Sequence, residues 1–575
     1  MAASINLLAV LEKTARESFS EEGIHVKKIA VVRKSDRFSS GDIVIPSGCH
    51  DKIQNEVLQK LRDKIFKSLL ESGQPVKKVS GDEFNSITVY LDRTIIFKEA
   101  IQSVMIQKER YGLKDEKRNE TILLCNECLL NNKTLLNKDD ISLDSLRSLM
   151  VQDHMVQLLQ SQCYDVFQLV RKDTYENYRP VLSQYGTDSS SILEGAVNTD
   201  SKNSVISKFL MNKFIEKVEK TEGTGIEKGD SERVSETAKT DSGPRLAYEF
   251  NMREYLKDKN LNVGKTGFDK NLSVCEVFSL DSPAELLNTS VLVSDALKEQ
   301  KAQKCIHVTG QSHAFSSQKI HLILRELLDI DEKSTTQKHF VYGPVTKRQS
   351  CSDSDIHTAD DLFRLRYAQL RQAAIMKYGE AVHGEGWAAT LEALTAACIK
   401  FEMLSCVSRN TLKLDLSEDE DMEGSGLATS SGSFVMYNCA RLATLFKHFQ
   451  EEVDSETYPP LPPISKIDFS VLREEAEWSL LFNYVCTFPD LVEQTIDNLD
   501  DCDTIYAKIH THKVCQMLIS LSRNLSSYYS RYHVLGEGRA QLLPTMYARL
   551  YLLKAVHQVM INGLALLGIQ PLSQL

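Results

Sequence analysis

Residues 546–569 read MYARLYLLKAVHQVMINGLALLGI, an apolar run whose large side chains recur every three or four positions. This spacing predicts a helix with a buried stripe, because it places those side chains on one face. Pro544 suits the first turn of such a helix, and Gly568 suits the position just past its end. The expected stripe consists of Leu550, Leu553, Val556, Met560, Leu564 and Leu567.

A second helix is predicted just upstream of this run. Its apolar positions, again three or four residues apart, are Ile509, Val514, Leu518, Leu521, Leu525, Tyr528 and Tyr532. Helical spacing continues back to residue 434, so we expect residues 434–575 to form an all-helical domain.

This helical end is basic, although the chain as a whole is acidic. The formal net charge is −11 over 575 residues, so the molecule as a whole should repel nucleic acid. Residues 507–575 nevertheless hold seven Lys or Arg and a single acidic residue, Glu537. A phosphate backbone is attracted to such a local surface, although a merely solvated basic face is the alternative. The interleaved Tyr528, Tyr529 and Tyr532 slightly favour RNA, because unpaired bases stack on aromatic rings.

The rest of the chain divides by composition. Residues 1–110 alternate predicted helices and strands, as in a small α/β domain, and residues 115–410 contain a βαβ unit built on ILLCN, residues 122–126. We expect residues 186–245 to be a disordered insertion, because TEGTGIEKGDSERVSETAKTDSG has too little apolar surface to bury. The acidic residues 411–433 are predicted to be a flexible linker. The expected fold class is therefore α/β plus all-α.

The cysteines indicate reduced thiols rather than disulfides. The chain has 13 of them and no predicted secretory signal or membrane span, so we expect a cytoplasmic location. Cys125 and Cys128 form one C-x-x-C, but no second pair follows at zinc-site spacing, so we expect no metal. His307 and His313 are better interpreted as a strand-end and a loop histidine than as ligands. GxxxxGK[ST] and GxGxxG are absent, and no cofactor is expected.

The C-terminal segments resemble the DALR anticodon-binding domain of arginyl-tRNA synthetases. Residues 546–569 are similar to the end of that domain, including Asn-Gly-Leu at residues 562–564 followed by LLGI. SFVMYNCARLATLF (433–446) resembles its first helix, and LSSYYSRYHVLG (525–536) resembles its helix-to-loop segment. The DALR tetrapeptide is not literal, since YARL stands near that place at residues 547–550.

The resemblance extends weakly over most of the chain. GDEFNSITVYL (81–91) is similar to the strand that closes the synthetases' N-terminal domain, which binds the elbow of tRNA. LRSLMVQDHMVQLLQSQCYDV (146–166) resembles the helix after the class I signature, and KFEMLS (400–405) resembles a KYADLS-type segment. The resemblance implies an elbow-binding α/β domain, a degenerate class I Rossmann domain and a C-terminal DALR helical bundle.

The two class I signatures are replaced in this chain. A synthetase places a His-x-Gly-His type motif at the start of that helix to hold the ATP phosphates, and this chain has SLDS. The KMSKS-type loop expected after HFVYGPV is replaced by TKRQSCSDSD. We therefore expect an inactive nucleotide site, in a protein that is not an enzyme. The degenerate signature positions are Ser142, Asp144, Ser145, Lys347 and Arg348.

The chain as a whole resembles non-catalytic, arginyl-tRNA-synthetase-like proteins of animals. That resemblance implies an adaptor that recognises arginine tRNA and presents it to a methyltransferase that makes 3-methylcytidine in the anticodon loop. No DNA or membrane partner is expected. Two alternatives stay open: an arginyl-tRNA synthetase with diverged signatures, and a protein-interaction scaffold that has lost RNA binding.

Eight residues of the helical domain are candidate tRNA contacts. The candidates for phosphate contacts are Arg441, Lys508, Arg523, Arg531, Arg549 and Lys554, and those for base contacts are Tyr437 and Tyr529.

Overall fold

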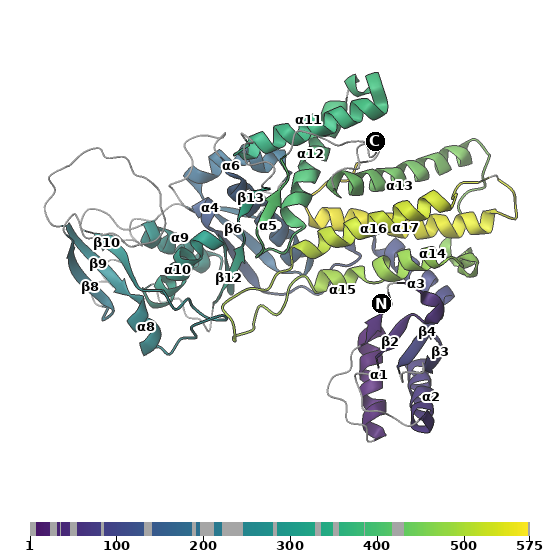
Figure 1. The fold of residues 1–575 in the computed structure, drawn as a ribbon, viewed down its shortest axis with the longest axis horizontal. Coiled ribbons are helices and arrows are strands. Elements are labelled where there is room, and N and C mark those ends of the chain that lie inside the picture. The colour runs from purple at the N-terminus through teal and green to yellow at the C-terminus, as the bar shows by residue number, and fades with distance from the viewer. Residues whose placement is uncertain are drawn as a thin grey trace.

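The computed structural model confirms the α/β plus all-α fold class (Figure 1). The structure describes residues 7–22, 31–34, 36–46, 55–81, 86–130, 141–186, 191–195, 212–220, 245–279, 285–327, 335–348, 356–384, 386–416, 431–536 and 538–572.

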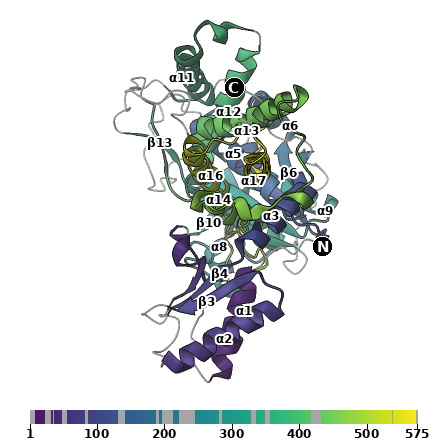
Figure 2. The same ribbon diagram turned by 90° about the vertical axis from the view of Figure 1, so that its right-hand side faces the viewer.

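The N-terminal region is an antiparallel sheet with two helices, α1 (Leu7–Glu21) and α2 (Asn55–Glu71), that pack against each other. Its strands lie in the order β1 (Val32–Arg33), β2 (Ile43–Ile45), β4 (Ile87–Leu91) and β3 (Val76–Gly81). The following helix, α3 (Arg93–Gln107), leaves this unit and packs against the C-terminal helices, as Figure 2 shows.

The central region is built on a five-stranded sheet in which every pairing is parallel. Its strands lie in the order β12 (Thr336–Tyr342), β11 (Lys304–Gly310), β5 (Thr121–Asn126), β6 (Asp165–Arg171) and β7 (Ile192–Gly195). The strands are buried along most of their length, because helices cover the sheet. The main covering helices are α5 (Leu143–Ser161), α9 (Glu285–Glu299) and α10 (Ala314–Leu327). Chain order reverses between β5 and β11, and ligands of such sheets bind at the carboxyl ends of the strands at this point.

The expectation of a disordered insertion over residues 186–245 is wrong where strands form. Strand β7 extends the parallel sheet, and β8 (Ile215–Lys220) pairs with β9 (Arg245–Asn251), which in turn pairs with β10 (Val274–Ser279). Phe214 is buried and Leu193 packs against the same core. The few apolar residues of these strands stand in a mainly polar stretch of sequence, so its overall composition did not predict the strands. Residues 187–190, 196–211 and 221–244 lie outside the described residues.

The expectation of a flexible linker over residues 411–433 is wrong at both of its ends. Strand β14 (Leu412–Leu414) pairs in parallel with β13 (Val345–Lys347), because Leu412 and Leu414 are buried in the core. At the other end, α13 already begins at Ser431. Residues 417–430 lie outside the described residues.

The C-terminal region is helical, as expected. Its long helices are α13 (Ser431–Asp454), α16 (His512–Arg531) and α17 (Leu543–Leu566), with the shorter α14 (Glu475–Leu480), a π-helical turn (Leu481–Val485) and α15 (Phe488–Glu493) between them. Two more helices, α11 (Ala359–Tyr378) and α12 (Trp387–Leu404), join this bundle to the central sheet. In the part of the chain that the structure describes, no helix combines the length and apolar composition needed to cross a membrane.

Helix α17 is the centre of the bundle. All six residues of its predicted stripe are fully buried, and Gly568 follows the helix with φ of +63°, the left-handed conformation that glycine adopts readily. Leu552, Ala555 and Val559 are also fully buried, so the helix is enclosed on more than the predicted face. Helices α3, α5, α13 and α16 all pack against it (Figures 1 and 2).

A buried ionic cluster ties the end of α17 to the central domain. Lys400 Nζ lies 3.0 Å from Asp153 Oδ2, and the two side chains are 1% and 3% exposed. The same ammonium donates hydrogen bonds to the carbonyl oxygens of Leu567 (3.1 Å) and Gly568 (2.9 Å). Lys400 belongs to α12 and Asp153 to α5, so these two helices and the end of α17 meet at the Lys400 ammonium although they are distant in sequence.

Candidate nucleic-acid interface

Three of the candidate tRNA contacts line one hollow of about 420 Å³ at the junction of α11, α13 and α16. These are Tyr437 and Arg441 from α13 and Tyr529 from α16. Tyr437 and Arg441 are four positions apart and therefore share one face of α13. The remaining lining residues are Lys377, Tyr378, Ala440, Thr444, Leu445, His448, His533, Val534 and Leu535. We call this hollow the cation–aromatic platform.

Cations and rings alternate on the cation–aromatic platform. The Arg441 guanidinium lies 3.8 Å from the centre of the Tyr529 ring. The Lys377 ammonium lies 4.3 Å from the centre of the Tyr437 ring and 5.0 Å from that of Tyr378. Such contacts hold the long cationic side chains against the surface while leaving their charge available to an anion.

The charge of the platform suits RNA. None of the described residues that line it is acidic, although the chain as a whole carries −11. Two histidines, His448 and His533, lie at its edge. A pocket with cations, rings and no carboxylates can stack an unpaired base and neutralise the adjoining phosphates.

Sequence reasoning missed Lys377 and Tyr378, the contribution of α11 to the platform. They belong to a segment predicted to be an ordinary helix, more than 50 residues before α13 in the chain. The available signal was MKYG, in which a lysine and a tyrosine precede a helix-ending glycine. The neighbouring Met376 is 67% exposed, an unusual position for a large apolar side chain.

Four of the other candidates lie outside this hollow. Lys508, in the segment before α16, and Arg523 and Arg531, on α16, are exposed. Lys554 of α17 is partly buried beside the ring of Phe446, and burial lowers the pKa of its ammonium. A tRNA contact at these four positions stays a prediction.

Arg549, the eighth candidate, makes a contact inside the protein. Its Nε lies 2.8 Å from Oε1 of Glu477, whose carboxylate is 1% exposed, and its own side chain is only 17% exposed. The Tyr528 hydroxyl also donates to Glu477, and the ring of Tyr532 lies over the guanidinium. The two charges are 72 residues apart, so sequence spacing gave no sign of the pair.

We expect Arg549→Ala to destabilise the helical bundle rather than to weaken tRNA binding directly. Removing the guanidinium leaves Glu477 as a buried and poorly compensated carboxylate, at a cost of about 2–3 kcal/mol. Chemical denaturation monitored by circular dichroism measures the loss. The exposed Arg531→Ala is the matched control, with a change below about 0.5 kcal/mol. An Arg549→Ala protein of wild-type stability would contradict the structural role.

A second hollow, of about 510 Å³, lies at the carboxyl ends of β5 and β11 and is lined by three of the degenerate signature positions, Ser142, Asp144 and Ser145. Ser142 caps α5, accepting from the Ser145 N–H at 3.1 Å, and Asp144 accepts from the Val345 N–H at 2.6 Å. Glu127 lines the same hollow and pairs with His313 at 3.2 Å, a hydrogen bond that raises the pKa of the imidazole. The helix terminus is thus flanked by carboxylates.

The two basic signature positions lie at the end of β13 and do not line this hollow. Lys347 ends β13, and Arg348 NH1 pairs with Asp415 Oδ2 at 2.8 Å. Residues 349–355, which complete the replaced loop, lie outside the described residues. Neither cation lines the hollow that holds Asp144.

Comparison with known sequences identifies the helical domain. Residues 435–575 match the family described as DALR anticodon binding domain. The chain is 42% identical over 271 residues to the mouse protein named DALR anticodon-binding domain-containing protein 3, a match that spans 47% of this chain and 48% of that protein. It is 29% identical over 490 residues to the zebrafish protein of the same name, which covers 85% of this chain and 83% of that protein.

Comparison with solved structures identifies the fold of the whole chain. The structure resembles Thermus thermophilus arginyl-tRNA synthetase with a TM-score of 0.61 at 13% identity, over 99% of this chain and 100% of that one. The Plasmodium falciparum arginyl-tRNA synthetase gives a TM-score of 0.63 at 11% identity, over 100% and 99% of the chains. Residues 435–575 therefore match the DALR anticodon binding domain, on an arginyl-tRNA-synthetase-like fold, and the chain is similar to the proteins named DALR anticodon-binding domain-containing protein 3.

Proposed function

We propose that this chain is a cytoplasmic, non-catalytic adaptor that recognises arginine tRNA and presents it to a tRNA methyltransferase making 3-methylcytidine. The DALR domain and the synthetase-like fold support tRNA binding. The observation that carries the proposal is the cation–aromatic platform, which lies between α11 and the DALR domain and has no acidic residue among its described lining residues. A base of the anticodon loop stacks on Tyr437 or Tyr529 while Arg441 and Lys377 hold its phosphates.

The second hollow favours an adaptor over a synthetase. A synthetase must hold the triphosphate of ATP against the first turn of the helix that corresponds to α5 in this chain. Here Asp144 and Glu127 line that place, and Ser142 already caps the helix. Negative side chains repel phosphate at the point where a synthetase needs to attract it, which supports the absence of adenylate formation.

The binding experiment uses the full chain in a filter-binding titration at physiological salt. We expect arginine tRNA to bind at least about tenfold more tightly than an unrelated RNA of equal length, because base contacts add to the phosphate contacts that both RNAs share. Equal affinity for the two RNAs would contradict recognition of tRNA. If protein partners are retained while tRNA is lost on pull-down, the scaffold alternative holds instead.

The same preparation separates the adaptor from a diverged synthetase. ATP–pyrophosphate exchange with arginine and arginine tRNA should stay at background, because the phosphate site is lined by carboxylates. Exchange above background would support the synthetase. Adding the chain to a 3-methylcytidine methyltransferase should raise methylation of arginine tRNA, and an unchanged rate would remove the presenting role while leaving tRNA binding standing.

A further inference from the structure

Two thiols and an imidazole meet on one face of the central sheet, outside the cation–aromatic platform. Cys305 and His307 are two residues apart on β11 and therefore point to the same face. Cys125 on β5 is the direct cross-strand partner of His307, so its side chain joins them. All three residues are buried, with relative exposures of 3% for Cys125, 0% for Cys305 and 4% for His307.

Two of the distances in this cluster match those of a tetrahedral metal site. Cys125 Sγ lies 3.7 Å from Cys305 Sγ, and Cys305 Sγ lies 3.7 Å from His307 Nε2. Two thiolates that bind one zinc ion at about 2.3 Å lie about 3.8 Å apart, and a thiolate and an imidazole lie about 3.5 Å apart. Ligand atoms of all three side chains lie within 4.8 Å of one another.

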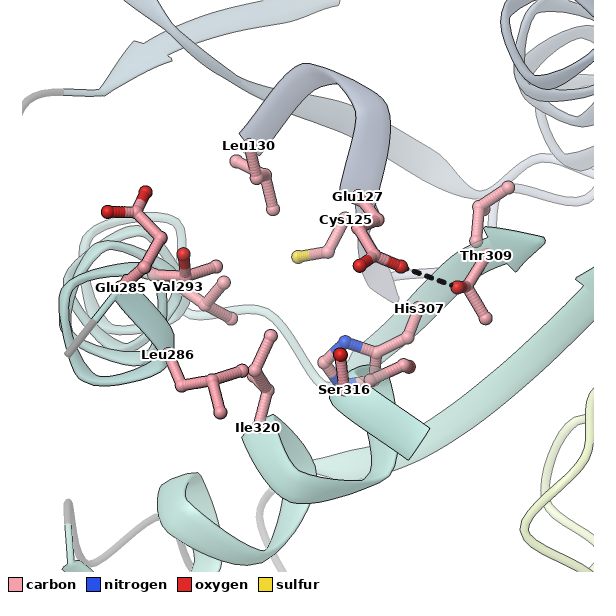
Figure 3. A pocket seen from close by; sticks show the side chains of 13 residues that line it. Cys125, Glu127, Leu130, Glu285, Leu286, Val293, His307, Thr309, Ser316 and Ile320 are labelled. Atoms are coloured by element: carbon pink, nitrogen blue, oxygen red, sulfur yellow. Dashed lines mark hydrogen bonds between the residues drawn. The ribbon is translucent and has the colours of Figure 1, made fainter. Parts of the chain in front are cut away.

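A cavity of about 180 Å³ opens directly beside the cluster. Cys125 and His307 line it, and Figure 3 shows the Cys125 sulfur pointing into the space that the labelled side chains surround. Glu127 and Glu285 also line the cavity, where they pair with His313 and Arg171 respectively. An ion held by these three side chains has a fourth coordination position that no protein ligand fills, and this position faces the cavity.

The surrounding groups leave His307 as the metal-binding imidazole. In the neighbouring His339, one ring nitrogen lies 2.8 Å from Ser317 Oγ and the other 2.9 Å from His321 Nδ1, so both are engaged. His307 Nε2 also lies 3.1 Å from Gln337 Oε1, so binding an ion through this nitrogen requires the Gln337 amide to turn away from it.

The chemistry of the cluster also suits a metal. Two thiolates neutralise the charge of a divalent ion, which limits the cost of burying it. Soft sulfur ligands with one imidazole select zinc over calcium or magnesium.

We propose that Cys125, Cys305 and His307 form a zinc site with one open coordination position facing the cavity. This proposal differs from the expectation of no metal, which rested on the absence of a second ligand pair at zinc-site spacing after Cys125 and Cys128. Cys128 is not part of the proposed site. The true partner of Cys125 lies 180 residues further along the chain, on the adjoining strand. The site is independent of tRNA recognition and fastens β5 to β11.

Metal binding by the full chain tests this site directly. The purified protein is titrated with Zn²⁺ against a competing chelating dye, and with Co²⁺ as a spectroscopic probe. We expect one equivalent of zinc, and a cobalt complex with thiolate charge-transfer and tetrahedral d–d bands. Cys125→Ser and Cys305→Ser should weaken binding by more than the ~10–100-fold loss that follows when a residue that only orients a ligand is changed.

Cys128→Ser is the matched control, because this thiol lies in the same C-x-x-C but outside the cluster, and it should bind zinc as the wild type does. Circular dichroism and tRNA binding verify that each variant is folded. If a Cys125→Ser or Cys305→Ser protein does not fold, the cobalt spectrum of the wild type decides the question. A wild type without tetrahedral thiolate bands, or ligand variants that keep wild-type zinc affinity, would overturn the site.

Discussion

Lys400→Met should cost about 3–5 kcal/mol of stability, the range found when one partner of a buried ion pair is removed. Methionine keeps most of the side-chain volume, so the loss comes from the charge rather than from a cavity. Asp153 then remains as a carboxylate that is 3% exposed, and the carbonyl oxygens of Leu567 and Gly568 lose their common donor. The change is measured as a shift of the denaturation midpoint or of the melting temperature.

Two further variants isolate the cause of this loss. Lys447→Met changes a lysine whose side chain is 65% exposed on α13, and it should shift stability by less than about 0.5 kcal/mol. The double variant Lys400→Met/Asp153→Asn removes the uncompensated charge and should be more stable than Lys400→Met alone. A Lys400→Met protein within about 1 kcal/mol of the wild type would show that the ion pair contributes little.

The double variant Arg441→Glu/Tyr529→Ala should weaken binding of arginine tRNA by at least about a hundredfold. Stacking of one base on a ring contributes about 1–3 kcal/mol, and reversing the charge of Arg441 makes the platform repel the phosphate that it now attracts. The stacked arrangement of these two side chains, 3.8 Å from guanidinium to ring centre, makes them one unit of the platform. Filter binding at several salt concentrations measures the effect.

The salt dependence of binding distinguishes a phosphate contact from a general loss of charge. Arg441→Ala alone should reduce the slope of log affinity against log salt by about 0.7–0.9, the contribution of one neutralised phosphate. Lys447→Glu is the control, since it reverses an exposed charge on the same helix but outside the platform, and it should change affinity little. If the double variant is folded and binds tRNA like the wild type, the platform is not the binding site.

The helices of the C-terminal domain could be predicted because local spacing determines them. The stripe of α17 and the glycine that ends it are both visible in the sequence and present in the structure. The enclosure of α17 on its other faces could not be predicted in the same way. It depends on α3 and α5, which lie hundreds of residues earlier in the chain. Their packing against α17 cannot be predicted from the periodicity of the sequence.

The candidate site residues likewise divide into those that local spacing brings together and those that only tertiary packing brings together. Tyr437 and Arg441 could be placed together from their spacing on one helix, whereas Lys377 reaches them only through the packing of α11. Arg549 looked like any other basic residue until its partner Glu477 was located on a different helix. Charge and residue type suggested which side chains can bind RNA, but tertiary contacts decide which of them are still available.

The central place of α17 has a consequence for biosynthesis. A ribosome makes residues 543–566 after every element that packs around them, including α3, α5, α13 and α16. Until that helix emerges, its partners hold apolar surface with nothing to cover it, which exposes the nascent chain to aggregation and to chaperones. The N-terminal sheet can form early because its contacts are local, whereas the bundle is completed only after residues 543–566 emerge. A premature stop codon before residue 543 removes the core of the bundle.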